Sequence, residues 1–203
     1  MEKRRLKPEK IFTSEMTASF KQYCKEFSLF YLRIQDDPFT TTTKFTHKKP
    51  FDAVAWAMCD DGCEYTTKVV ALEYKAVNGE KRWPLSSVKP HQISGLSKAF
   101  YAGAEAYIMV NFRGLEGPVK TRAVLLTLET YLKWQSLGKK SVTWKEMFEY
   151  SGEVYWLERV KLESGGYGWD VSGLFSGIHG LDDVMSAVYS PELKKLNEKK
   201  EVE

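Results

Sequence analysis

The sequence predicts an α/β fold in which helices flank the faces of a central mixed β-sheet. Small or aromatic residues alternate with larger apolar ones along 51–58, and a second apolar segment follows at 66–75. The turn-forming residues Asp60-Asp61-Gly62 lie between them, so the two segments are expected to form a β-hairpin. Apolar residues at helical spacing in 14–27 predict a helix before this hairpin, and Pro90 and Gly103 delimit a second helix, 90–102, after it.

The other segments complete the predicted sheet and its covering helices. We expect strands at 28–34, 106–112 and 122–128, and helices at 129–137, from Thr143 onwards and at 182–189. The pattern leaves open whether 154–162 is strand or helix, gives no assignment for 165–180, and indicates a loop or edge strand at 36–49 and an irregular link at 83–88. The predicted organisation is a basic arm (1–12), one domain (13–190, with its core at about 13–128 and a helical or irregular part at 129–190) and a charged tail (191–203).

The composition is that of a soluble globular domain. Of 203 residues, 43% are hydrophobic and 28% are charged. No apolar run approaches the roughly 20 residues that cross a bilayer, and the N-terminal residues lack the apolar stretch of a signal peptide. Three cysteines, an odd and low number, do not indicate a disulfide framework. We therefore expect a cytoplasmic protein without a membrane partner.

The net charge of +3 permits nucleic-acid binding without requiring it. The distribution of charge is more informative, because basic residues gather near the N-terminus and again just before Asp52. In the second group, Lys44, Lys48 and Lys49 are suitably placed for contact with backbone phosphates. An ordinary solvated loop explains the same three lysines equally well.

Glu73 and Lys75 are the residues that most clearly indicate chemistry. They are two apart on a predicted strand, so both side chains leave the same face, although the preceding residues of the strand are apolar. Asp52 and Glu73 are nearly symmetric about the turn, which predicts that the two carboxylates lie side by side. Adjacent carboxylates repel each other, and a hard divalent cation such as Mg²⁺ removes the repulsion. The alternative is an exposed Glu–Lys pair on a strand surface.

Four ordered segments resemble the RecU-type Holliday-junction resolvases of the PD-(D/E)XK nuclease superfamily. They are Glu73-Tyr74-Lys75-Ala76, residues 83–88, His91-Gln92-Ile93 and residues 106–112. The resemblance spans about residues 50–113, roughly a third of the chain. It implies a restriction-endonuclease-like core and a Mg²⁺-dependent endonuclease, with Mn²⁺ as a possible substitute and no organic cofactor. It also implies branched or recombination DNA as substrate, a role in recombination or repair, and a homodimer.

The same resemblance implies roles for individual residues. Asp52, Glu73 and the Tyr74 carbonyl would bind the metal, and Lys75 would be the catalytic lysine. Gln92 would line the site, and Glu15 would be the helix glutamate that completes it. For Glu15, a carboxylate that stabilises a helix N-terminus is an equally good reading. Arg82 joins the three lysines named above as a candidate for DNA contact.

This sequence also departs from the family pattern. Phe51 separates Pro50 from Asp52, the aspartate-to-glutamate gap is longer, and residues 35–49 are too few for the stalk that RecU proteins insert into the junction. Junction-specific cutting is therefore less strongly implied than nuclease activity. Two alternatives stay open: a nuclease-like fold that binds DNA or a protein without cutting, and an unrelated α/β protein with an accidental match.

Overall fold

The computed structural model describes residues 7–27, 29–34, 49–60, 65–79, 81–116, 118–149 and 154–175. Within this part, the central sheet consists of β1 (Leu29–Arg33), β2 (Ala53–Asp60), β3 (Tyr65–Asn78), β5 (Glu105–Arg113), β6 (Thr121–Thr127) and β8 (Val154–Leu157). The helices are α1 (Pro8–Glu26), α2 (Pro90–Tyr101), α3 (Leu128–Ser136) and α4 (Trp144–Glu149), with short 3₁₀ turns η1 (Leu85–Ser87) and η2 (Ser172–Leu174). Two small ribbons pair β4 (Trp83–Pro84) with β7 (Ser141–Val142), and β9 (Arg159–Lys161) with β10 (Tyr167–Trp169).

The central sheet is mixed. Its strand order is β1-β2-β3-β5-β6-β8, and all neighbouring strands are antiparallel except β3 and β5. Parallel neighbours need a crossover connection, and α2 supplies it. The predicted α/β class with helices on both faces is thus confirmed, and the arrangement is consistent with a restriction-endonuclease-like core.

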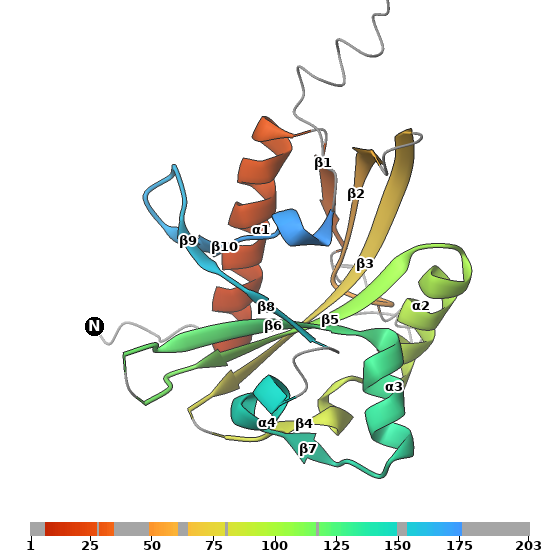
Figure 1. Ribbon diagram of the computed structural model, residues 1–203, viewed down its shortest axis with the longest axis vertical. Coiled ribbons are helices and arrows are strands. Elements are labelled where there is room, and N and C mark those ends of the chain that lie inside the picture. The colour runs from red at the N-terminus through yellow and green to blue at the C-terminus, as the bar shows by residue number, and fades with distance from the viewer. Residues whose placement is uncertain are drawn as a thin grey trace, which may run out of the picture.

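Two hydrophobic cores lie on opposite faces of the sheet (Figure 1). On one face, Phe12, Met16 and Phe20 of α1 pack over the sheet, and the buried alanines of β2 leave room for these large side chains. On the other face, α2 and α3 cover Ile108 and Val110 of β5. The predicted alternation of β2 is confirmed, because its alanines are buried while the residues between them are half-buried.

The feature that positions the site is the unequal length of β2 and β3. The ladder between them pairs Ala53 with Leu72 at its last rung, whereas the ladder between β3 and β5 runs on to Asn78 and Arg113. From Glu73 onward, β3 therefore has no β2 residue opposite it in the ladder. The N-terminal half of α1 passes beside this open edge (Figure 1).

The predicted start of the first helix is wrong. The helix begins at Pro8, six residues before residue 14, so part of the predicted basic arm is helical. Proline is well suited to the first helical position because it lacks the N–H that would be unsatisfied there, and Glu9 follows in the first turn.

The segments that the sequence left open are resolved as short elements. Residues 154–162 form strands β8 and β9, and the irregular link at 83–88 contains β4 and η1. Strand β10 and η2 lie within the segment without an assignment. Trp169 and Phe175 of that segment are buried in the same core as the apolar residues of α1. The predicted helix 182–189 and most of the 36–49 segment lie outside the described residues. No helix in the described ranges is both long and apolar enough to cross a membrane.

Candidate active site

Asp52 and Glu73 stand opposite each other, one step beyond the last rung of the β2–β3 ladder. The Asp52 N–H still donates to the Leu72 carbonyl, at 2.9 Å. The Asp52 side chain then replaces the backbone acceptor that a longer β2 would supply, because its Oδ2 accepts from the Tyr74 N–H at 2.8 Å. The N–H and C=O of one strand residue point to the same edge, so the Tyr74 carbonyl is directed toward this edge as well.

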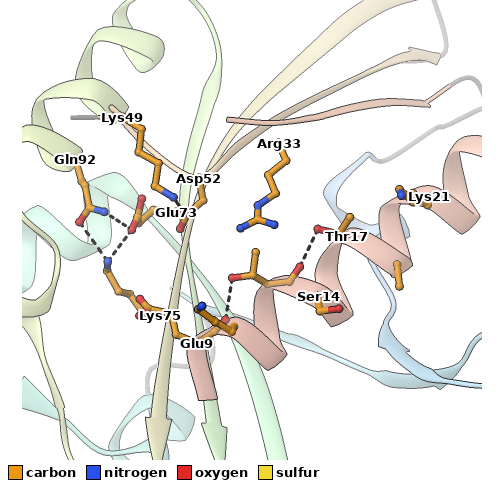
Figure 2. Close-up of a pocket in the computed structure, with 13 residues that line it drawn as sticks. Glu9, Ser14, Thr17, Lys21, Arg33, Lys49, Asp52, Glu73, Lys75 and Gln92 are labelled. Atoms are coloured by element: carbon orange, nitrogen blue, oxygen red, sulfur yellow. Dashed lines mark hydrogen bonds and ion pairs between the residues drawn. The ribbon is translucent and has the colours of Figure 1, made fainter. Parts of the chain in front are cut away.

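The Glu73 carboxylate is almost completely buried, at 1% exposure. Its Oε1 accepts from Lys75 Nζ at 2.6 Å and from Gln92 Nε2 at 2.6 Å (Figure 2). Its Oε2 is buried and has no hydrogen-bond partner among the described residues. A buried carboxylate oxygen without a partner is costly, so one coordination position at Glu73 is unsatisfied within the described structure.

Gln92 is fixed by the start of α2. Its Oε1 accepts from the backbone N–H of Lys89, at 2.9 Å, as a helix cap, and from Lys75 Nζ at 3.2 Å. The capping bond defines which end of the amide is the oxygen, so the amide nitrogen must face Glu73. Gln92 thereby connects α2 to the strand that carries Glu73 and Lys75.

Each carboxylate of the cluster is paired with one lysine, yet burial still disfavours the charged form of Glu73. Burial raises the pKa of Glu73 to about 7, the charge of Asp52 adds to the rise, and Lys75 opposes it. Asp52 is paired with Lys49, whose Nζ lies 2.7 Å from Oδ1. Two adjacent carboxylates and a directed carbonyl are oxygen donors of the kind that hard divalent cations take. Within the described residues no cluster of three His, Cys, Asp or Glu forms, so further ligands would be backbone groups or water.

A cavity of about 730 Å³ opens in front of the two carboxylates. One wall is a face of α1, from Glu9 to Lys21, and the opposite wall carries Lys75 and Gln92. Figure 2 shows the Arg33 guanidinium reaching into this space from β1. Basic side chains outnumber acidic ones in the lining: Lys10, Lys21, Arg33, Lys49 and Lys75 against Glu9, Asp52 and Glu73.

The structure brings together Asp52, Glu73, Lys75, Gln92 and Lys49, as the sequence predicted, and does not bring Glu15 to them. Glu15 lies on another side of α1, where Arg113 binds both of its carboxylate oxygens, at 2.8 and 3.0 Å, and Trp169 Nε1 donates to it at 3.2 Å. Arg82 is held by Glu146 at 2.9 Å and by Ser141, and it lines an adjoining hollow. Lys44 and Lys48 lie outside the described residues.

Sequence reasoning missed Glu9, Lys21 and Arg33, and it did not link Lys10 to the site. The signal for Glu9 was present, because Pro8-Glu9 is a common helix start. Once α1 begins at Pro8, the residues at 10, 14, 17 and 21 fall on one helical face, and all four line the cavity. Arg33 carried no such signal, because only the pairing of β1 with β2 shows where its side chain lies.

No protein-family model and no curated protein sequence matches this chain. Among solved structures, the chain is similar to Hjc, a Holliday junction resolvase from Archaeoglobus fulgidus, an archaeal hyperthermophile. The identity is 16%, the match covers 70% of this chain and 95% of that chain, and the TM-score is 0.31. A likeness at this level does not carry a function from one chain to the other.

Proposed function

We propose that this protein is a metal-dependent DNA endonuclease that hydrolyses phosphodiester bonds, with branched or recombination DNA as its substrate. The observation that carries the proposal is the Asp52–Glu73 pair at the open edge of β3, with Lys75 on the same strand. The buried Glu73 Oε2 belongs to this observation, because it has no hydrogen-bond partner among the described residues. A purely structural ion pair does not need a second carboxylate, and it does not need to face a cavity. A metal-dependent phosphodiesterase site uses both, since the carboxylates hold the cation and the cavity admits the phosphate.

Asp52, Glu73 and the Tyr74 carbonyl would hold the cation, Mg²⁺ or Mn²⁺. When bound, such a cation lowers the pKa of a water molecule and polarises a phosphoryl oxygen. Lys75 is held 2.6 Å from Glu73 and 3.2 Å from Gln92, so its ammonium is fixed beside the carboxylate pair. From there it would orient the attacking water or neutralise charge that builds up on the phosphate. Gln92 holds Glu73 in place through its amide and does not need to react.

The walls of the cavity suit a nucleic-acid backbone. Lys10, Lys21 and Arg33 line it, and none of the three forms an ion pair with a carboxylate of the described residues. Such cations bind phosphates and fix the position of the strand without reading its sequence. Among the described residues that line the cavity, Gln92 is the only one with a side-chain amide, and both ends of that amide are already hydrogen-bonded. Contacts to backbone phosphates are therefore expected to supply most of the DNA affinity in this cavity.

The preference for branched DNA comes from the resemblance to the RecU-type resolvases and not from the geometry. The proposal of a homodimer, in which two copies would cut two strands, comes from the same resemblance. Residues 35–49 are too few for the family's stalk, so any selectivity for junctions must arise elsewhere in the protein. A role in recombination or repair would follow from such a substrate.

The test is cleavage of a labelled four-way junction, a flap and a linear duplex, with Mg²⁺, with Mn²⁺ and with EDTA. Wild-type protein is compared with Lys75→Met, which keeps most of the buried side-chain volume and removes the charge. Metal-dependent cutting that the substitution abolishes supports the proposal, and cutting of the junction alone supports a resolvase. DNA binding by a folded wild type that cuts none of the three would reject the enzyme in favour of a binding module.

A further inference from the structure

A second hollow adjoins the carboxylate site on the far side of Lys75. Its volume is about 660 Å³, and it shares Glu9, Lys75 and Gln92 with the first cavity. Because the two cavities have these lining residues in common, they adjoin each other, and the two together are referred to as the groove. The carboxylate pair lies in the first cavity, and the groove runs on beyond it.

The lining of the second hollow is basic. Apart from the residues shared with the first cavity, its charged side chains are Lys81, Arg82 and Lys89. Arg82 is bound to Glu146, but neither Lys81 nor Lys89 forms an ion pair with a carboxylate of the described residues, and both lysines are exposed. Within the described residues, the Lys89 ammonium donates one long hydrogen bond, of 3.4 Å, to the Ser86 carbonyl. Two lysines are thus available to a ligand.

The backbone of β3 adds a neutral donor to this hollow. The Tyr74 N–H points to the open edge, where Asp52 accepts it. Ala76 is two residues further along the strand, so its N–H has the same direction. Ala76 lines the second hollow, and the β2 ladder ended four residues before it. Backbone N–H groups beside lysines are common donors to phosphate oxygens.

We infer that Lys81, Lys89 and the Ala76 N–H form a second phosphate-binding subsite, on the opposite side of the scissile bond from Arg33 and Lys21. The inference rests on the proposed function, since it takes the ligand to be a DNA strand. The strand then enters along α1, passes the carboxylate pair and leaves over Lys81 and Lys89. A groove that continues on both sides of the carboxylates accommodates an internal phosphodiester and does not require a strand end.

The first test measures binding without cleavage. The affinity of fluorescein-labelled duplex in EDTA is measured against salt concentration for wild type, for Lys81→Ala/Lys89→Ala and for Lys98→Ala/Lys120→Ala. The control pair removes the same charge from exposed lysines that line neither cavity. Each lost phosphate contact reduces the slope of log affinity against log salt by roughly 0.9 on duplex DNA. We expect a reduction of about 1.8 for the subsite variant and a much smaller change for the control.

The second test places the contact on the strand. Phosphates at successive positions of the labelled strand are replaced one at a time by neutral methylphosphonates. In wild type, a substitution on the Lys81 side should weaken binding, and in the subsite variant the same substitution should have no further effect. Substitutions on the Arg33 side should weaken binding of both proteins equally.

The failure of the inference is distinguishable from the failure of the proposed function. One outcome is that wild type cuts DNA, while the subsite variant has the same salt slope as the control and loses affinity at the same methylphosphonate positions. In that case the subsite is wrong and the nuclease stands. A second outcome is that no protein cuts DNA, while the subsite variant still has the smaller salt slope and is insensitive to methylphosphonate on the Lys81 side. In that case the subsite stands and the nuclease is wrong.

Discussion

The carboxylate of Asp52 accepts the backbone N–H of Tyr74 at 2.8 Å, at the point where strand β2 would continue its ladder with β3. This bond fixes Asp52 opposite Glu73 and satisfies the first N–H of the open strand edge. A side chain that replaces a strand residue in this way brings a charged oxygen to the edge of the sheet, which a backbone carbonyl cannot do. The position of the carboxylate pair thus follows from where β2 ends.

Asp52→Asn separates the charge of this residue from its structural role. The asparagine carbonyl can still accept the Tyr74 N–H, so we expect the free energy of unfolding to change by no more than about 1 kcal/mol. The variant loses a charged oxygen, so metal-dependent cleavage should fall by two orders of magnitude or more. Urea unfolding and a cleavage time course check the two parts. A large loss of stability would show that the charge, and not the hydrogen bond, holds the strand end.

The hairpin and its carboxylate pair could be predicted from the sequence because both depend on local patterns. The alternation in β2 and the position of the turn signal in the sequence predict a register, and the observed ladder places residue 52 opposite residue 73. Residues 61–64 of the predicted turn lie outside the described residues. Gln92 was found only through the family resemblance, because nothing in the helix pattern shows that its amide turns toward β3. The contacts of Glu15 with Arg113 and Trp169 join residues about 100 and 150 positions apart, and no local pattern reports such contacts.

Substitutions of Glu9 and Glu15 should have opposite effects: the first should affect cleavage and not stability, and the second should affect stability and not cleavage. Glu9 lines both cavities beside Lys75, so Glu9→Gln is expected to leave stability nearly unchanged and to reduce the cleavage rate about 10-fold or more, as for residues that support a metal site. Glu15→Ala removes the partner of the largely buried Arg113 and should cost about 2 kcal/mol of stability. Its cleavage rate per folded molecule should be that of wild type.

Thermal unfolding and the cleavage rate, measured below the unfolding transition, check this contrast. The account of Glu15 would be overturned by a stable Glu15→Ala protein that no longer cleaves DNA.

Gly95 on α2 lies against Pro50, two residues before Asp52. A methyl group built on Gly95 would lie 2.6 Å from the Pro50 carbonyl oxygen and 2.8 Å from its Cα, so backbone would have to move. Gly95→Ala should therefore lower stability by about 1–3 kcal/mol, as overpacking does. It should also reduce cleavage, because Asp52 and Gln92 would shift relative to each other.

Gly173→Ala is the matched control, because its methyl group would meet no atom within 4 Å. Chemical denaturation and cleavage are measured for both variants. Equal behaviour of the two would mean that the Gly95–Pro50 contact does not position the site.

The raised pKa of Glu73 predicts how stability depends on pH in the absence of metal. Burial, with Asp52 as the second cause, raises the pKa from its usual 4.5 to about 7, so the folded protein keeps this proton to higher pH than the unfolded chain. The stability linked to that proton is fully present below about pH 4.5 and is lost as the pH rises through about 7.

The experiment compares the free energy of unfolding of wild type with that of Glu73→Ala in EDTA. Between pH 5 and 8, we expect wild type to lose on the order of 2–3 kcal/mol of stability relative to the variant. Mg²⁺ should restore the stability of wild type above pH 7. It should have little effect at pH 5, where it competes with the proton on Glu73. A difference that does not vary with pH would show that Glu73 is ionised throughout this range.

The most direct test of the central claim, that Asp52 and Glu73 together bind a divalent cation, is a titration with Mn²⁺ followed by electron paramagnetic resonance. Wild type should bind Mn²⁺ at one site of defined affinity, and Asp52→Asn and Glu73→Gln should each weaken that affinity at least about tenfold. Glu15→Ala, which lies outside the cluster, should bind as wild type does. The claim would be contradicted if wild type bound no Mn²⁺, or if both carboxylate variants bound it with unchanged affinity.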